Sequence, residues 1–168
     1  RSGHGALLSA TVGRKEQAID WYRESLDIRE RLTGEYPEMV NFRRILARFL
    51  VTCPDNSFHD PDLAIDLALA NIEAAPRNAG YWNLLGIAYY RAGLWREAID
   101  ALKKSERLFD GRNVGYVGFF LAMSQWQLGD AEAAEQCFAQ ADRWTKANQS
   151  GNIELQHFRE EAMRTLQY

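Results

Sequence analysis

The sequence predicts an all-α fold, a solenoid in which antiparallel helix pairs stack one after another and a C-terminal helix caps the stack. Two observations predict it. Small and apolar residues recur 36 positions apart, as in the pairs Gly86 and Ala122, Gly93 and Gly129, Ala98 and Ala134. Within each unit, apolar residues also recur every three or four positions, and these stretches end in helix-stop residues. No stretch has the two-residue period of a strand.

The N-terminal half is expected to form a partial helix followed by three full helices. In order, we expect one long helix over 14–33 preceded by a partial first helix, a helix near 38–52, a loop over 53–59 and a helix up to about 75. Gly34 is expected to close the long helix. Asp60 and Pro61 open the third helix as N-cap and first-turn proline, and Pro76 ends it.

The C-terminal half repeats the helix pair and then adds a cap. The expected helices run through 81–89, 95–109, 114–128 and 131–147, with a last one over 152–166. Gly93 and Gly129 supply left-handed residues at the turns, and Asp130 caps the helix that follows. One face of the last helix carries an apolar stripe, Leu155, Phe158, Ala162 and Leu166, as a terminal cap needs. The whole chain, 1–168, is thus expected to be one solenoid with units at about 1–34, 38–77, 79–112 and 115–148 and a cap over 152–167.

Composition excludes several classes of protein. The chain has 168 residues, 46% of them apolar, and a net charge of −3, which argues against a general binder of nucleic-acid phosphates. It contains neither an 18-residue apolar run nor a secretory signal, so no membrane association is expected. The absence of an initiating Met indicates a piece of a longer chain. Cys53 and Cys137 stand far apart in the sequence, which predicts two buried thiols in a reducing, cytoplasmic setting.

Two helix motifs carry a resemblance to a known family. Trp82-Asn83-Leu84-Leu85-Gly86-Ile87-Ala88-Tyr89 matches the first-helix signature of the tetratricopeptide repeat, and Ala134 with Phe138 matches the second-helix signature. The resemblance covers nearly all of 1–148. It implies a right-handed superhelix whose function is protein–protein interaction, and a small residue at Gly86 because the two helices of a unit cross closely there.

A further resemblance concerns the larger protein. The sequence is similar to repeat regions of large bacterial proteins, notably planctomycete ones, in three segments taken together: 50–55, 59–61 and the Trp82 motif. Such regions often follow a serine/threonine kinase domain. The sequence itself contains no kinase motif, so this context is an analogy.

Groups that could catalyse a reaction or bind a metal have structural explanations. His59 precedes Asp60, Pro61 and Asp62, and these four residues read as a loop and a helix start rather than a metal site. His4 and His157 have no ligand partners at workable spacing. No phosphate-binding loop is present. The sequence therefore predicts no enzyme activity, no metal and no cofactor.

The inner surface presented by the first helices is the candidate binding site. Residues next to the core stripe are expected to face it: Arg44, Arg48, Asn83, Ile87, Tyr90, Arg91, Tyr116, Phe119, Met123 and Trp126. Aromatic residues beside arginines suit an apolar segment that carries an acidic group. The family's carboxylate-clamp pattern is met in part, because Asn83 is present but Ile87 replaces a second Asn. Alternatively, the terminal helix or a further unit covers these aromatics.

Three function classes follow. The first is a non-enzymatic scaffold that binds a protein partner, as a peptide or helix, on the concave face. The second is a structural spacer or weak self-association element within a larger protein. The third is a regulatory domain of a linked kinase.

Overall fold

The computed structural model describes residues 3–110, 112 and 114–167, and the side chains from residue 14 onward. This part of the chain contains eight α-helices, one short 3-10 helix and no strand. The helices are α1 (Gly3–Glu35), α2 (Val40–Thr52), η1 (Asn56–Phe58), α3 (Pro61–Ala74), α4 (Ala79–Arg91), α5 (Trp95–Phe109), α6 (Val114–Gln127), α7 (Ala131–Asn148) and α8 (Ile153–Leu166).

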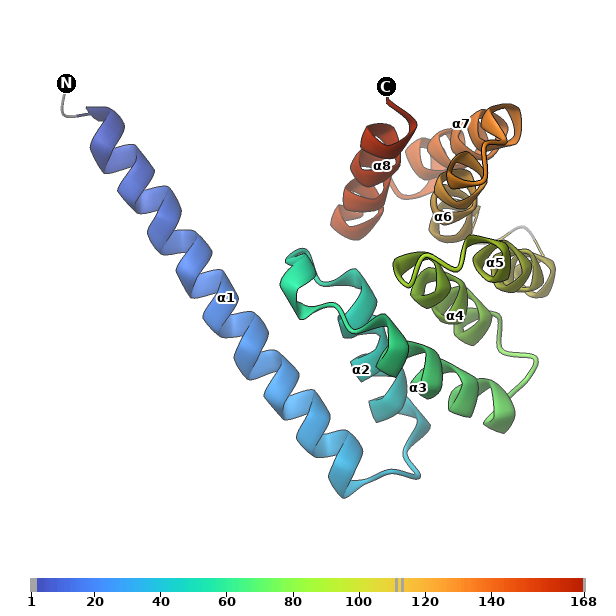
Figure 1. The fold of residues 1–168 in the computed structure, drawn as a ribbon, viewed down its shortest axis with the longest axis horizontal. Coiled ribbons are helices and arrows are strands. Elements are labelled where there is room, and N and C mark those ends of the chain that lie inside the picture. The colour runs from blue at the N-terminus through green and yellow to red at the C-terminus, as the bar shows by residue number, and fades with distance from the viewer. Residues whose placement is uncertain (1–2, 111, 113, 168) are drawn as a thin grey trace.

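The helices form a curved stack of pairs, the α-solenoid that the repeat pattern predicted. In Figure 1 the helices α2, α4 and α6 line the inner side of the curve, and α3, α5 and α7 lie outside them. Each inner helix packs against the outer helix that follows it in the chain, and each outer helix also packs against the next inner one. Because a single pair cannot bury its own apolar face, this stacking produces one continuous core.

The predicted boundaries of the paired helices are confirmed, and residues at the helix ends explain them. Gly93 and Gly129 turn the chain between two helices with φ values of 76° and 84°, which L side chains rarely adopt. The Asp60 carboxylate accepts a hydrogen bond from the Leu63 N–H at 3.0 Å and so caps α3. Asp130 caps α7 in the same way.

Close helix crossings explain the small residues inside the pairs. A Cβ atom placed on Gly86 would lie 2.5 Å from Cγ of Leu102, so α4 and α5 meet there with no room for a side chain. In the next pair, a Cβ atom on Gly118 would lie 2.8 Å from that of Ala141. The predicted crossing at Gly86 is therefore confirmed, and the second crossing uses a glycine four residues before Ala122.

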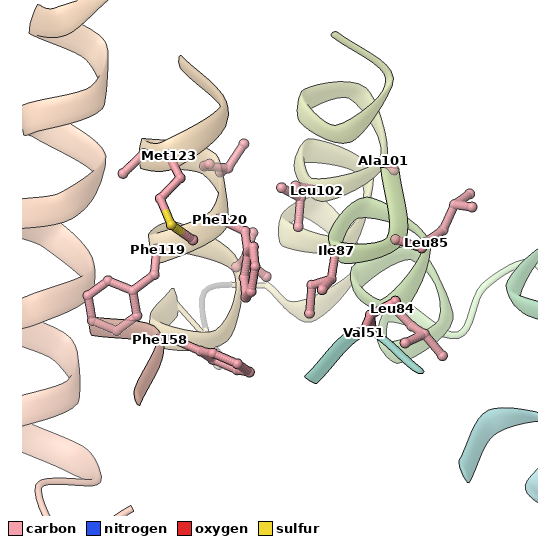
Figure 2. Packing of buried hydrophobic residues seen from close by; sticks show 14 of the residues in the cluster. Val51, Leu84, Leu85, Ile87, Ala101, Leu102, Phe119, Phe120, Met123 and Phe158 are labelled. Carbon is pink, nitrogen blue, oxygen red and sulfur yellow. The ribbon is translucent and has the colours of Figure 1, made fainter. Parts of the chain in front are cut away.

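The largest buried side chains lie where successive pairs meet. Figure 2 shows Leu102 and Ile87 of one pair facing Phe120 of the next. Phe119, Phe120 and Met123 are completely buried, so α6 is surrounded by apolar neighbours on all sides. This helix is the centre of the C-terminal half of the core.

At the N-terminus, the prediction of two helices was wrong. The helix does not break before residue 14: α1 is a single helix from Gly3 to Glu35, and it passes through Gly13 and Gly34. Glycine inside a helix costs only about 1 kcal/mol relative to alanine, so a helix can continue through such a residue. In the described part of the chain, α1 therefore packs chiefly against α2 instead of forming a helix pair of its own.

The C-terminal helix α8 caps the stack, but not in the position of a further inner helix. Leu155, Phe158, Ala162 and Leu166, the predicted stripe, are all buried. However, within the preceding pair, α4 and α6 pack more against the outer helix than against the inner one, whereas α8 packs more against the inner helix α6 than against the outer helix α7. In Figure 1, α8 accordingly lies on the inner side of the curve. The cap thus covers part of the concave face itself.

None of the helices described, the 33-residue α1 included, combines the length and the apolar character that crossing a bilayer requires.

Candidate functional site

A pocket of about 400 Å³ opens on the inner face, between α2, α4 and α8. We call it the inner pocket. It is lined by Asn41, Arg44, Arg48, Thr52, Asn78, Gly80, Tyr81, Asn83, Leu84, Ile87, Phe109, Tyr116 and Phe158. Its volume is within the range of about 300–1,000 Å³ that is common for ligand sites in proteins.

Half of the predicted binding residues line this pocket. They are Arg44, Arg48, Asn83, Ile87 and Tyr116. The helical period explains the grouping, because residues four positions apart lie one turn apart on the same face. Arg44 and Arg48 are such a pair on α2, and Asn83 and Ile87 are a second pair on α4. The structure brings both pairs to one place.

Phe119 and Met123 were wrongly predicted to face the inner surface. Both are completely buried, and the ring of Phe119 packs 5.8 Å from that of Phe138 on α7. It is the adjacent residue, Phe120, whose ring points toward the concave side, 5.5 Å from Tyr90 and 4.9 Å from Phe158. Figure 2 shows Phe119 and Phe120 on opposite sides of α6. The error was one of helical phase, about 100° per residue.

Tyr90, Arg91 and Trp126 lie outside the pocket, half-buried against the core. Arg91 is a structural link: its Nε donates to the Val51 carbonyl at 3.0 Å, its Nη atoms pair with Glu161 of α8, and its guanidinium lies over the Phe120 ring. Burial, and next the Glu161 carboxylate, raise the pKa of Tyr90 above its usual value. The terminal helix α8 thus covers Tyr90 and Arg91, as the alternative prediction stated.

The two arginines at the pocket differ in whether an acidic side chain already pairs with them. Arg48 forms an ion pair with Glu154, in the first turn of α8, and both side chains are partly exposed, at 44% and 29%. Arg44 is half-buried, and within the described part of the chain it has neither an ion pair nor a hydrogen-bond partner. None of the residues lining the pocket is acidic. The pocket is therefore positively charged, with one arginine available.

Asn83 provides an unmet hydrogen-bond acceptor in the same pocket. The residue is 8% exposed, and its Oδ1 atom is buried without a donor among the described residues. A buried polar atom without a partner costs about 1–3 kcal/mol, so such atoms are rare unless something else satisfies them. Leu84, Ile87 and Phe158 supply apolar surface beside it.

Some pocket residues were not predicted. Asn41 lies three positions before Arg44 on the same face of α2, so the helical period alone could have identified it. Phe158 was predicted as a cap residue but not as a pocket wall. Its helix is held at the pocket by Asn152, which caps α8 and donates from Nδ2 to the Tyr116 hydroxyl at 2.8 Å. No local pattern specifies where such a cap will pack.

The remaining candidate groups form no second site. His59 is half-buried rather than on the loop surface, and its Nε2 lies 2.9 Å from the Cys53 carbonyl oxygen. Burial, as the largest cause, lowers the pKa of His59. Asp60 caps α3 as predicted. Among residues 14–110, 112 and 114–167, no three His, Cys, Asp or Glu side chains gather as a metal site requires. The His4 side chain lies outside the described residues.

Comparison with known proteins agrees with this architecture. Residues 119–148 match the tetratricopeptide repeat family model. The solved structure of MamA AMB-1 is similar over 79% of this chain and 73% of its own, with 28% identity and a TM-score of 0.61. MamA MSR-1 is similar over 75% of this chain and 68% of its own, with 27% identity and a TM-score of 0.60.

A thermophilic TPR protein of Thermus thermophilus is similar over 93% of this chain and 80% of its own, with a TM-score of 0.64. At 20% identity this likeness concerns the fold alone. No curated protein matches the sequence. The chain thus carries a tetratricopeptide repeat at 119–148, and its helix pairs form the right-handed solenoid of tetratricopeptide repeat proteins.

Proposed function

We propose that the chain is a protein-interaction scaffold that binds a short peptide segment of its partner in the inner pocket, and that this segment carries an apolar side chain and an acidic group. The observation that carries the proposal is the pairing of two unmet demands at one place. Among the described residues, Arg44 has no anionic partner and the Oδ1 atom of Asn83 has no donor.

An acidic residue within a peptide meets both demands. Its side-chain carboxylate suits Arg44, because arginine presents a planar fork of donors to a carboxylate. Its backbone N–H suits the Asn83 Oδ1 atom once the buried amide turns toward the pocket. An adjacent apolar side chain suits the surface made by Ile87 and Phe158. The volume of about 400 Å³ favours a short segment over a whole helix.

The same pocket argues for binding rather than catalysis. Its walls contain no Cys, His, Asp or Glu that could act as nucleophile or general base. The partner segment belongs to another protein or to another domain of the same polypeptide, such as the kinase domain that the resemblance suggests. A net charge of −3 favours a protein partner over nucleic acid.

We place this activity in a reducing compartment such as the cytoplasm. Cys53 and Cys137 are both free. Burial, the largest cause in each case, raises the pKa of both thiols, so each stays protonated and resists oxidation.

An array of hexapeptides tests the proposal. The peptides are N-acetylated and C-amidated, so that only side chains carry charge, and the labelled full chain is the probe. We expect the retained peptides to combine Asp or Glu with an aromatic or aliphatic residue. Fluorescence anisotropy should then show that Arg44→Gln weakens binding of these peptides about tenfold or more, the size of a charged hydrogen bond.

Arg96→Gln is the matched control, because Arg96 is an exposed arginine on α5 outside the pocket. It should leave the affinity unchanged. Retained peptides without acidic enrichment, or an equal loss of affinity in the two variants, would contradict the proposed site.

A second candidate function, self-association, has one observation in its favour. Trp21 on α1 is 73% exposed, and Ile28, two turns along the helix, is 42% exposed. Large apolar side chains exposed together often mark an interface. Light scattering of the full chain over a range of concentrations would detect a dimer, and Trp21→Ala would abolish it if α1 is the interface.

A further inference from the structure

The Arg48–Glu154 ion pair differs from the other link between the inner face and α8. Arg91 and Glu161 are more deeply placed, with side-chain exposures of 14% and 23%, and Arg91 also contacts Val51 and Phe120. Arg48 and Glu154 are exposed at 44% and 29% and lie at the edge of the inner pocket. The deeper pair fastens α8, whereas the outer pair stands where a ligand would enter.

We propose that Glu154 is an internal counter-ion, held at Arg48 until the carboxylate of a bound acidic peptide replaces it. This inference rests on the proposed function, because it assumes that the inner pocket takes an acidic ligand. It adds a competing group supplied by the protein's own capping helix. Glu154 thereby sets both the affinity of the pocket and its selectivity.

The geometry supports replacement rather than simultaneous binding. Arg44 and Arg48 lie one helical turn apart on α2, so one carboxylate can reach both guanidinium groups. The Nη2 atom of Arg48 already donates to Oε2 of Glu154. A second carboxylate at that guanidinium would lie close to the first, and like charges at such a distance repel. The incoming carboxylate must therefore displace Glu154.

Displacement leaves α8 in place. Glu154 lies in the first turn of this helix, where its side chain is partly exposed and can turn toward solvent. The apolar stripe, the Arg91–Glu161 pair and the Asn152 cap continue to hold the helix against α6. No large movement of the backbone is needed.

Replacement affects acidic and neutral ligands differently. A neutral peptide leaves the Arg48–Glu154 pair intact and gains nothing from either arginine. An acidic peptide gains both arginines but loses the energy of the internal pair. The net effect of Glu154 is to weaken the binding of acidic ligands while leaving the binding of neutral ligands unchanged.

The experiment compares Glu154→Gln with the unaltered full chain on the hexapeptide array described above. Acidic peptides should bind Glu154→Gln about two- to fivefold more tightly, the size expected for a partly exposed ion pair. Neutral peptides should bind both proteins equally. A second array with free C-termini separates side-chain acids from a terminal carboxylate, and we expect the side-chain acids to respond.

Two further variants make the result specific. Glu161→Gln removes the same charge from α8 but away from the pocket, so it should not tighten binding of acidic peptides. In an Arg48→Gln background, Glu154→Gln should have no effect, because the group for which the two carboxylates compete is gone. Helical circular dichroism and the unfolding midpoint of each variant confirm that α8 remains folded.

The outcomes are distinguishable. Suppose that acidic peptides bind, but that Glu154→Gln does not tighten their binding or tightens it equally in the Arg48→Gln background. The internal counter-ion is then refuted and the proposed function survives. If Glu161→Gln tightens the binding of acidic peptides as much as Glu154→Gln does, the effect is one of general charge and the internal counter-ion is refuted. If neither array retains acidic peptides, the proposed function fails and this inference with it.

Discussion

The two ends of the solenoid are each a single helix beyond the pairs, yet they are packed very differently. At the C-terminus, α8 buries all four residues of its apolar stripe and is tied to α2 and α4 by ion pairs. At the N-terminus, α1 contacts the stack through a few groups, among them Tyr22 against Phe58 at 5.8 Å. Its Trp21 is largely exposed. An apolar residue stabilises a solenoid end only where a neighbour covers it.

The largest expected effect contrasts one aromatic from each end. Phe158→Ala should lower the free energy of unfolding by about 3–5 kcal/mol, because it leaves a cavity beside the buried ring of Phe120. Trp21→Ala should change it by less than about 0.5 kcal/mol, as expected for an exposed site. Urea denaturation of both variants measures the difference. Equal losses would mean that α1 is covered in solution, for instance by a second copy.

A smaller effect compares a glycine inside a pair with one at the open end. Gly86→Ala should destabilise by about 1–3 kcal/mol, since the new Cβ atom would lie 2.5 Å from Leu102. Gly34, near the end of α1, has no atom of the described residues within 4 Å of such a Cβ atom, so Gly34→Ala should stabilise by about 0.4–1 kcal/mol. Thermal unfolding monitored by circular dichroism distinguishes the two signs. Destabilisation at both sites would show that the α1 glycine has a role in a turn.

The smallest expected effect is the loss of folding stability at acid pH. Burial chiefly lowers the pKa of His59, near the α1 end, so the folded state disfavours the protonated ring. Stability should therefore fall as the pH drops from about 6.5 through the folded pKa. Burial of Asp142 opposes its ionisation, but hydrogen bonds from Lys146 and Arg159 outweigh it and lower the pKa. Its contribution is present above about pH 4 and is lost only below that, through the folded pKa.

The two ends should accordingly respond to acid in sequence. Protection from hydrogen exchange, taken relative to the intrinsic exchange rate at each pH, should fall first for amides around the 53–59 loop, as the pH drops below about 6.5. Protection where α7 and α8 meet should fall only below about pH 4. His59→Gln should remove the first step and Asp142→Asn the second. A single transition that neither variant shifts would show that these groups do not control acid stability.

The fold was predictable because its determinants are local. Gly93 and Gly129 mark turns, Asp60 and Asp130 mark helix starts, and the apolar stripe of α8 marks a helix that must be covered. Each of these signals acts within about four residues along the chain. The continuous α1 was missed because a glycine permits a turn without requiring one.

The site was predictable only in part, because it depends on helix phase and on a distant element. Arg44 and Arg48 were found through their spacing. Phe119 was chosen in place of Phe120, since both occur in an all-apolar helix, where no polar face fixes the phase. Glu154 could not be found at all, because nothing in the sequence near residue 154 indicates a partner 106 residues earlier.

That separation also has a consequence for biosynthesis. In an ordinary repeat array each unit contacts only its neighbours, so the units can be completed one by one as the chain leaves the ribosome. Here the guanidinium groups of Arg48 and Arg91 pair with carboxylates that lie 106 and 70 residues later in the chain. Neither ion pair can form until α8 has been synthesised. At about 5–20 residues per second, the inner surface stays unfinished for several seconds after α4 has been synthesised. The concave face is therefore completed only after α8 has been synthesised.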